Sequence, residues 1–169
     1  IWISGSGARY EFSRAGTSLD YSEPSGQWGR FRFETSGTRK YRYVEKDGSG
    51  RWFNRSGGLE YIYDHSGNAL DLVYVTDPNA AAYQLAKVQY VNAGQEVVGR
   101  ALTFTWGTSR HLDQVYDFDL SKSGTDKKDR AWSFVYAGSL LTQVKEPTEV
   151  GVEALVNRYT YWSSGQRSG

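Results

Sequence analysis

Apolar and polar residues alternate along much of the chain. Residues 30–34 place Phe31 and Phe33 between charged neighbours, and residues 41–43 repeat this arrangement with two tyrosines around an arginine. Residues 102–106 alternate large apolar side chains with threonine, and residues 132–136 form a further triplet of this kind. A period of two with Tyr, Phe, Trp and Thr enriched is typical of half-buried β-strands. The pattern therefore predicts an all-β chain.

Short clusters of Gly, Ser, Asn and Asp separate these segments, at 36–37, 47–50, 56–58, 66–68, 92–94 and 163–165. Gly adopts positive φ easily, and the polar side chains can hydrogen-bond their own backbone, so such clusters favour turns. Turns about every ten residues between strands predict tandem hairpins and a mostly antiparallel sheet. One helix candidate, residues 79–87, follows Pro78, but its second half is also typical of a strand.

Pairs of aromatic residues separated by one position recur, and four of them are followed by Gly six positions after the first ring. These four units are Tyr10, Phe12 and Gly16; Phe31, Phe33 and Gly37; Tyr61, Tyr63 and Gly67; and Tyr159, Tyr161 and Gly165. A single hairpin cannot bury its own aromatic face, because it has no second layer to cover it. The recurrence therefore predicts hairpin units that stack on one another.

Two further aromatic pairs are followed by Leu and then Val on a predicted returning strand. They are Phe104 and Trp106 with Leu112 and Val115, and Phe134 and Tyr136 with Leu141 and Val144. In each case the Leu and the Val are three positions apart, which would place them on opposite faces of a regular strand. Either both faces of the returning strand are covered or a β-bulge intervenes.

One of these units resembles the repeat of a known family. Residues 61–70, YIYDHSGNAL, are similar to the YD repeat of the Rhs/YD-repeat family, whose pattern is roughly Y-x-Y-D-x-x-G-R-L, and Asp64 supplies the Asp of the motif. Residues 131–147 resemble a family variant of the form R-x-W-x-F-x-Y followed by L-x-x-V-x-D-P, and residues 157–165 resemble the start of another unit. The likeness is clearest over 52–169; the Arg after the glycine is absent, and one extra residue precedes Leu70.

The resemblance implies a structural, non-catalytic role. Rhs/YD-repeat proteins include bacterial polymorphic toxins, wall-associated proteins and animal teneurins, and their antiparallel strands wind into a hollow shell that encloses an effector in the toxins. It implies that residues 1–169 form one YD-repeat region, a curved sheet within a spiral β-shell, from a secreted or surface protein, most often bacterial. The implied partners are neighbouring repeats and an enclosed toxin domain. The Asp-Pro-x-Gly segment that cleaves some members has no full counterpart, since residues 77–80 read Asp-Pro-Asn-Ala.

Composition narrows the class further. Aromatic residues make up 15% of the chain and the net charge is +1, which argues against intrinsic disorder and gives no electrostatic case for nucleic-acid binding. The absence of Cys excludes disulfides, and no apolar run approaches the roughly 18 residues of a membrane helix. The chain also lacks Met, and its last unit stops before a Leu and Val strand. Both features predict a piece of a longer array whose open edges favour self-association.

Catalytic and metal sites find little support in the residues, and no cofactor is expected. His65 and His111 are the only histidines, both near predicted turns, and neither follows a recognisable nucleophile motif. The acidic segment 117–126 has Gly124 at its eighth position and Lys128 at the twelfth, unlike a calcium-binding EF-hand loop. A glycosidase would need two facing carboxylates, and no pair stands out.

A glycan-binding β-module is the main alternative to the structural role. Trp106 and Trp132 share strand faces with other aromatic residues, which favours a place in the core. Trp28 and Trp52 lie in or near predicted turns and are the candidates for stacking against a sugar. An enzyme with an unrecognised acidic site is a third hypothesis, which predicts a deep cleft with convergent, pKa-shifted carboxylates.

Overall fold

The computed structural model describes residues 2–3, 8–26, 28–76, 83–107, 109–119, 128–146 and 155–161. Every regular element among these residues is a β-strand, and the large sheet is antiparallel and open, which confirms the predicted all-β hairpin fold. Residues 83–87, the described part of the helix candidate, belong to a strand, so the helical alternative is wrong there. In the sheet this strand lies between β8 and β10, so its backbone has strand neighbours on both sides.

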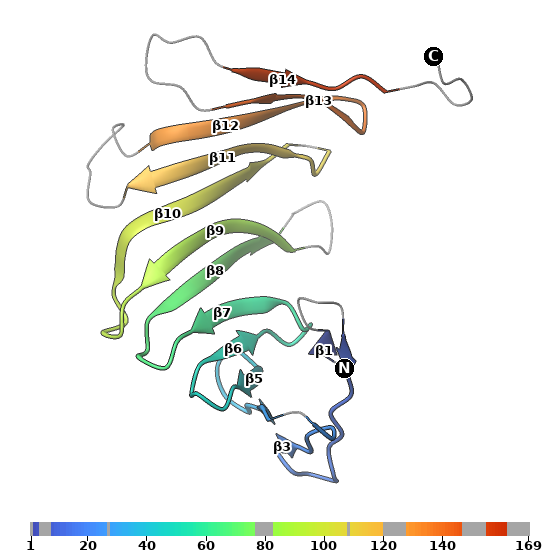
Figure 1. Cartoon of the computed structure of the whole chain (residues 1–169), viewed down its shortest axis with the longest axis vertical. Helices are drawn as coiled ribbons and strands as arrows, with labels where there is room; N and C mark the ends of the chain where they lie inside the picture. Colours follow the sequence, from blue (N-terminus) through green and yellow to red (C-terminus); the bar gives the residue numbers. More distant parts are fainter. Residues whose placement is uncertain are drawn as a thin grey trace. The chain divides into compact units, whose positions relative to one another are not determined.

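The strands follow one another in chain order. They are β1 (Trp2–Ile3), β2 (Arg9–Tyr10), β3 (Asp20–Tyr21), β4 (Arg30–Phe33), β5 (Tyr41–Val44), β6 (Gly50–Phe53), β7 (Leu59–Tyr63), β8 (Ala69–Thr76), β9 (Tyr83–Val91), β10 (Val97–Trp106), β11 (Leu112–Asp119), β12 (Lys128–Ala137), β13 (Leu140–Lys145) and β14 (Val156–Arg158). β1 pairs with β2, and β3 to β14 form a sheet in which each strand is hydrogen-bonded to its neighbours in sequence (Figure 1). The sheet is therefore an uninterrupted meander of hairpins.

Contacts divide the chain into two compact units. Unit 1 comprises Ile1–Val73 and Gln89–Val98, and unit 2 comprises Tyr74–Val88 and Gly99–Gly169. Strands β8, β9 and β10 each contribute residues to both units.

One five-residue turn recurs throughout the described chain, at 45–49, 54–58, 64–68, 92–96 and 107–111. In each copy the first residue donates its N–H to the C=O of the fifth, and its own C=O accepts from the N–H of the fourth, at 2.8–3.1 Å. The fourth residue has positive φ: 88°, 86° and 88° at Gly48, Gly57 and Gly67, and 65° and 61° at Gln95 and Arg110. These features define a three-residue hairpin loop, a type I turn followed by a left-handed residue.

The first residue of the turn often adds a side-chain acceptor. Asp64 Oδ1 accepts from the N–H groups of Ser66 and Asn68, both at 2.9 Å, and its Oδ2 accepts from the Asn68 amide at 3.0 Å. Asn54 Oδ1 accepts two backbone N–H groups in the same way, and Asn92 Oδ1 accepts one. The Asp of the Tyr63–Asp64 pair is thus a turn-closing acceptor, which gives the motif a physical reason.

β-Bulges explain the spacing of three between Leu and Val. Leu112 lies opposite Trp106 and Val115 opposite Phe104, so Asp113 is an extra residue in β11. Leu141 and Val144 lie opposite Tyr136 and Phe134 in the same way, with Thr142 as the extra residue of β13. Of the two alternatives that the sequence left open, the structure has the bulge, and it brings Leu and Val onto the same face.

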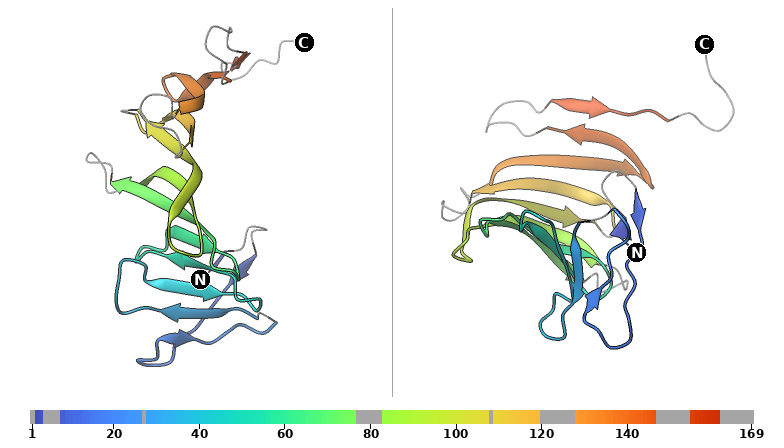
Figure 2. Two further views of the ribbon diagram at one scale, coloured as in Figure 1. Left: turned by 90° about the vertical axis from the view of Figure 1, so that its left-hand side faces the viewer. Right: turned by 60° about the horizontal axis from the view of Figure 1, so that its bottom comes forward.

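Unit 1 carries aromatic clusters on both faces of its short strands β4 to β7. Figure 2 shows the backbone of these strands, coloured from blue to green. The first cluster surrounds Phe31, whose ring centroid lies 5.3–6.4 Å from five other rings: Phe12, Tyr21, Tyr41, Tyr43 and Phe53. The second cluster consists of the buried Tyr61, Ala69 and Val91 with Trp52 and Tyr63 packed against them. Because Trp52 lies opposite Arg42 and Phe53 lies opposite Tyr41, strand β6 serves one cluster on each face.

In unit 2, most of the large apolar side chains point to one face of the sheet, because side chains alternate between the two faces along each strand. Strands β11 to β14 lie side by side and curve along their length (Figure 1). The register collects one set of half-buried apolar side chains on a single face: Phe104, Trp106, Leu112, Val115, Trp132, Phe134, Tyr136, Leu141 and Val144. The opposite face is mixed: Tyr116, Val135 and the buried Ala101 lie there among threonine, serine and glutamine side chains.

The turn geometry predicts the effect of substitutions at 92–96. Gln95→Gly should raise the free energy of unfolding by about 0.5–1 kcal/mol. Gly removes the steric cost of a side chain in the left-handed conformation, and this gain exceeds the extra backbone entropy that Gly loses on folding. Ala93→Gly, in the same turn but without positive φ, is the matched control and should destabilise the chain slightly. Denaturant unfolding of the two variants measures both signs, and a destabilising Gln95→Gly would contradict the turn assignment.

Candidate functional sites

The two tryptophans considered for glycan stacking lie in different surroundings. Trp28 is 75% exposed, and Lys46 Nζ sits 5.2 Å from the centre of its ring. Trp52 is half-buried against the second cluster of unit 1, and the Arg42 guanidinium lies 5.2 Å above it. Each ring therefore has a cation over it, and the two tryptophans differ mainly in exposure.

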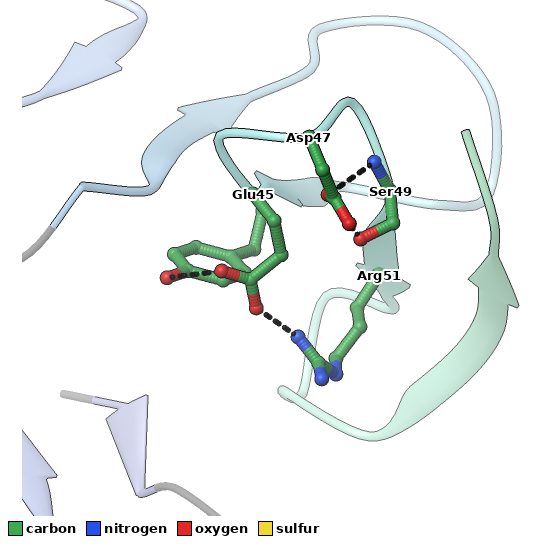
Figure 3. A network of polar contacts seen from close by, with 5 residues as sticks. Glu45, Asp47, Ser49 and Arg51 are labelled. Atoms are coloured by element: carbon green, nitrogen blue, oxygen red, sulfur yellow. Dashed lines mark hydrogen bonds and ion pairs between the residues drawn. The ribbon is translucent and has the colours of Figure 1, made fainter.

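Tyr43 is the most buried large side chain, with 1% of its surface exposed. Its ring occupies space that a side chain at Gly29 would fill, and its hydroxyl donates to Glu45 Oε2 at 3.3 Å. Glu45 in turn accepts from Arg51 Nη1 at 2.7 Å, beside the turn in which Asp47 binds Ser49 (Figure 3). Burial, followed by the nearby charge of Glu45 and this hydrogen bond, raises the pKa of Tyr43 to about 12.

Unit 1 repeatedly places a guanidinium between an aromatic ring and a carboxylate. Arg39 lies 4.0 Å above the Tyr61 ring and pairs with Asp71 at 2.8 Å. Arg51 lies 6.0 Å from the Tyr43 ring and pairs with Glu45 at 2.7 Å. The planar cation stacks on the ring while its N–H groups bind the carboxylate, so each arginine covers an aromatic face that the single-layer sheet leaves open.

A hollow of about 740 Å³ lies in unit 2, between the end of β12 and the turn that joins β10 to β11. Its walls include Trp106, Phe134 and Tyr136, and its polar lining includes Ser109, His111 and Asp113. His111 stacks on Tyr136 with ring centroids 4.4 Å apart and planes 24° apart. A smaller hollow of about 380 Å³ in unit 1 is lined by residues 49–51, 62–64, 68–70 and Tyr90.

The carboxylates with a displaced pKa lie in turns, and Asp64 also borders the smaller hollow. Hydrogen bonds from Asn68 lower the pKa of Asp64, and hydrogen bonds from Ser49 lower the pKa of Asp47. Both side chains are exposed, and the charge of His65 adds a small effect in the same direction. These shifts follow from turn closure, which stabilises the ionised form.

The other candidates for chemistry are only partly described. Asp117 is held by Arg100 through two contacts of 2.8 Å, whereas residues 120–126 of the acidic segment lie outside the described part. The same is true of residues 77–80, of Trp162 and of Gly165. Within the described ranges, no group of three or more His, Asp or Glu side chains could hold a metal ion, and no helix is long and apolar enough to cross a membrane.

The remaining repeat residues fall where hairpins need them. Gly16, Gly37 and Gly67 all have positive φ, Phe12 is buried, and Tyr10 lies in β2. Tyr159 and Tyr161 follow β14 and are exposed, and the Tyr161 hydroxyl donates to Leu141 C=O at 2.7 Å. The sequence analysis placed turns at 56–58 and 92–94, but it missed the turn-closing acceptors Asn54 and Asn92 with which these turns begin. Asn directly after a strand, with a turn residue three positions later, is the signal that could have found them.

The acid stability of the chain should depend on Asp64. Its pKa in the folded state is lower than its ordinary 3.8, so its contribution is present above that pH and is lost as pH falls through the folded pKa. Asp64→Asn should therefore lose less stability than the wild type between about pH 4 and pH 2. Thermal unfolding across this window measures the difference. Ser66→Ala keeps the carboxylate and its backbone bonds, and so should remain as acid-sensitive as the wild type.

At alkaline pH the stability of the chain should depend on Tyr43, whose pKa is raised on folding whereas that of Asp64 is lowered. A folded-state pKa of about 12 against an ordinary 10 means that its contribution is complete below pH 10 and is lost as pH rises through 12. Tyr43→Phe should flatten this loss, as measured by denaturant unfolding between pH 9 and pH 12. Tyr41→Phe, on the same strand and face, is the control. An equal effect of both variants would show that burial beside Glu45 is not the cause.

Comparison with known proteins adds no family assignment. A scan against models of protein families and a search of curated proteins both find no match.

Proposed function

We propose that the chain is a non-catalytic structural repeat module of a secreted or surface protein of the Rhs/YD-repeat type. In this proposal its hairpins form part of the wall of a shell that encloses a toxin or cargo domain. Its partners are neighbouring repeats of the same parent chain. The single observation that carries the proposal is the strand order, in which each strand pairs with the strands before and after it.

The recurring turn supports this reading. Five copies of one hydrogen-bonded loop join successive strands in the described chain, although their sequences differ. A fold built by repeating one local device can be lengthened by adding units, because each hairpin needs only its neighbours. The aromatic residues are stacked along the strands of unit 1 or collected on one face of unit 2, as a repeated wall requires.

The outer edge of β3 is already satisfied. Phe33 N–H donates to Leu19 C=O at 2.8 Å, and since bonded and non-bonded pairs alternate, the N–H and C=O of Asp20 point away from β4. The Ser18 hydroxyl accepts from Asp20 N–H at 3.2 Å and donates to Asp20 C=O at 3.1 Å. The next outward N–H, that of Ser22, donates to Ser13 C=O at 2.7 Å.

The outer edge of β14 has no such cover in the described residues. Glu146 N–H donates to Leu155 C=O and Tyr159 N–H donates to Thr142 C=O, both at 2.9 Å. With Val144 opposite Asn157, this alternation turns the backbone groups of Val156 and Arg158 outward. A row of unpaired N–H and C=O groups is a template for another strand. The next repeat is therefore expected to pair with β14.

Carbohydrate binding at a cell surface is the second candidate function. Its support is the ring of Trp28, which is 75% exposed. Trp28 is not among the residues that line the two hollows described above. The structural role rests on a property of the whole strand order and is the stronger proposal.

The β14 edge provides the test. The isolated chain should self-associate in light scattering, and Arg158→Pro should weaken that association at least about tenfold, because Pro removes an outward N–H. Arg158→Ala removes the same side chain but keeps the N–H, so it should associate like the wild type. Asn157→Pro should instead unfold the edge, since it removes an inward bond to β13.

Hydrogen exchange tests the repeat-array proposal directly. In the isolated chain diluted to monomer, the amides of Val156 and Arg158 should exchange fast and that of Asn157 slowly. When the chain is expressed with the segment that follows it in its parent protein, all three should become protected. A monodisperse monomer whose outward amides stay exposed in the longer protein would overturn the proposal.

A further inference from the structure

The unit 2 hollow combines aromatic walls with an unusually placed carboxylate. Asp113 is the extra residue of the β11 bulge, so its side chain leaves the regular alternation of the strand. Its Oδ1 approaches Gly107 so closely that a Cβ there would lie 2.7 Å away. Gly at position 107 therefore makes room for the carboxylate at the rim of the hollow.

The ring walls are held in place by contacts of their own. The Trp106 indole N–H donates to Leu85 C=O at 2.8 Å, which fixes the ring and leaves no N–H free for a ligand. His111 is stacked on Tyr136, and both line the hollow with Phe134. The hollow thus offers a ligand aromatic faces and edges, together with the hydroxyls of Ser109 and Tyr136 and the imidazole of His111.

The Asp113 carboxylate has no hydrogen bond or ion pair within the described residues. Unit 1 shows how this chain completes the same combination of groups. Asp71 beside the Tyr61 ring is paired with Arg39, and Glu45 beside the Tyr43 ring is paired with Arg51. In both places a guanidinium satisfies the carboxylate and covers the ring. The unit 2 hollow has the carboxylate and the rings, and no arginine or lysine is among its lining residues.

We propose that this hollow binds an organic cation, a guanidinium or alkylammonium group, with its charge on Asp113 and its apolar surface against Trp106 and Tyr136. A cation over an aromatic face gains about 0.5–2 kcal/mol, more as the site is desolvated, and a carboxylate adds a charge-assisted hydrogen bond. The hollow's volume of about 740 Å³ lies in the range of small-molecule sites. The proposal concerns a binding site and does not depend on the repeat-array proposal.

Two other uses of the same residues fit less well. A hydrolytic triad needs hydrogen bonds that link a nucleophile, a base and an orienting acid. Ser109, His111 and Asp113 line the hollow, but within the described chain no hydrogen bond links their side chains. A metal site would need at least three suitable ligands together, and the described residues contain no such group.

Titration of the full chain with N-acetyl-arginine amide tests the proposal. The NMR signals of the Trp106 indole and the His111 ring report binding. Saturable shifts at both residues with a dissociation constant in the millimolar range are expected. N-acetyl-citrulline amide has nearly the same shape without the charge, and should bind at least about tenfold more weakly. Equal binding of the two probes, or shifts centred on Trp28, would overturn the proposal.

Variants separate the carboxylate from the rings. Asp113→Asn keeps the size of the exposed side chain and should weaken binding of the arginine probe about tenfold. Tyr136→Leu should weaken it as well, whereas Asp47→Asn, an exposed turn carboxylate of unit 1, should leave it unchanged. Unchanged binding by Asp113→Asn, with a wild-type spectrum elsewhere, would refute the role of the carboxylate.

Tetramethylammonium chloride distinguishes two sources of the cation. If both tetramethylammonium and the arginine probe bind at the hollow, the site accepts free alkylammonium compounds as well as arginine side chains. Binding of the arginine probe alone assigns it to a guanidinium, such as an arginine side chain of a partner. Failure of both probes would overturn the proposal and leave the repeat-array proposal untouched.

Discussion

The pair of backbone hydrogen bonds that closes the five-residue turn is the constraint on which the structure depends. Because the first residue bonds both the fourth and the fifth, the loop length is fixed, and with it the register of the two strands that it joins. In an antiparallel sheet, register decides which side chains share a face. The turns thus determine that Phe104 faces Val115 and that Tyr43 faces Arg51. A slip of one residue would exchange the two faces of every strand beyond it.

A single-layer sheet has two faces to protect, and the two units do so differently. Unit 1 packs rings on both faces and places arginines over those that remain open, as with Arg39 on Tyr61 and Arg42 on Trp52. The long side chain of arginine supplies apolar cover while its charge is satisfied by carboxylates such as Asp71. Unit 2 collects most of its large apolar residues on one face and leaves them half-buried. The aromatic rings of unit 1 therefore pack against one another on both faces of the sheet, whereas those of unit 2 lie mainly along one face.

The sequence predicts the fold well because the fold is local. Period-two alternation and glycine turns are visible without any long-range contact, and the all-β hairpin arrangement follows from them. The turn near 92–94 was predicted as well, but not its left-handed position, because Gln95 occupies it where composition favours Gly or Asn. The unit 2 hollow could not be predicted either. It depends on Asp113 being the bulged residue. The sequence pattern fits a bulge and a strand covered on both faces equally well, so it did not identify this residue.

The Tyr63–Asp64 pair shows why one motif is easy to recognise while its neighbours are not. Tyr63 belongs to the sheet, where its hydroxyl accepts from Arg42 Nε at 3.0 Å, and Asp64 belongs to the turn, which it closes from the first position. At two other junctions the strand-end position is held by Phe53 or Val91, and the turn-closing position by Asn54 or Asn92. At 107 the side-chain acceptor disappears altogether, and the backbone bonds alone close the loop. What repeats is an apolar strand end, a closed turn and a left-handed fourth residue, and several residue types satisfy each requirement. Several different sequences can therefore close the same turn, so the register of the hairpins is kept even where the sequence repeat is weak.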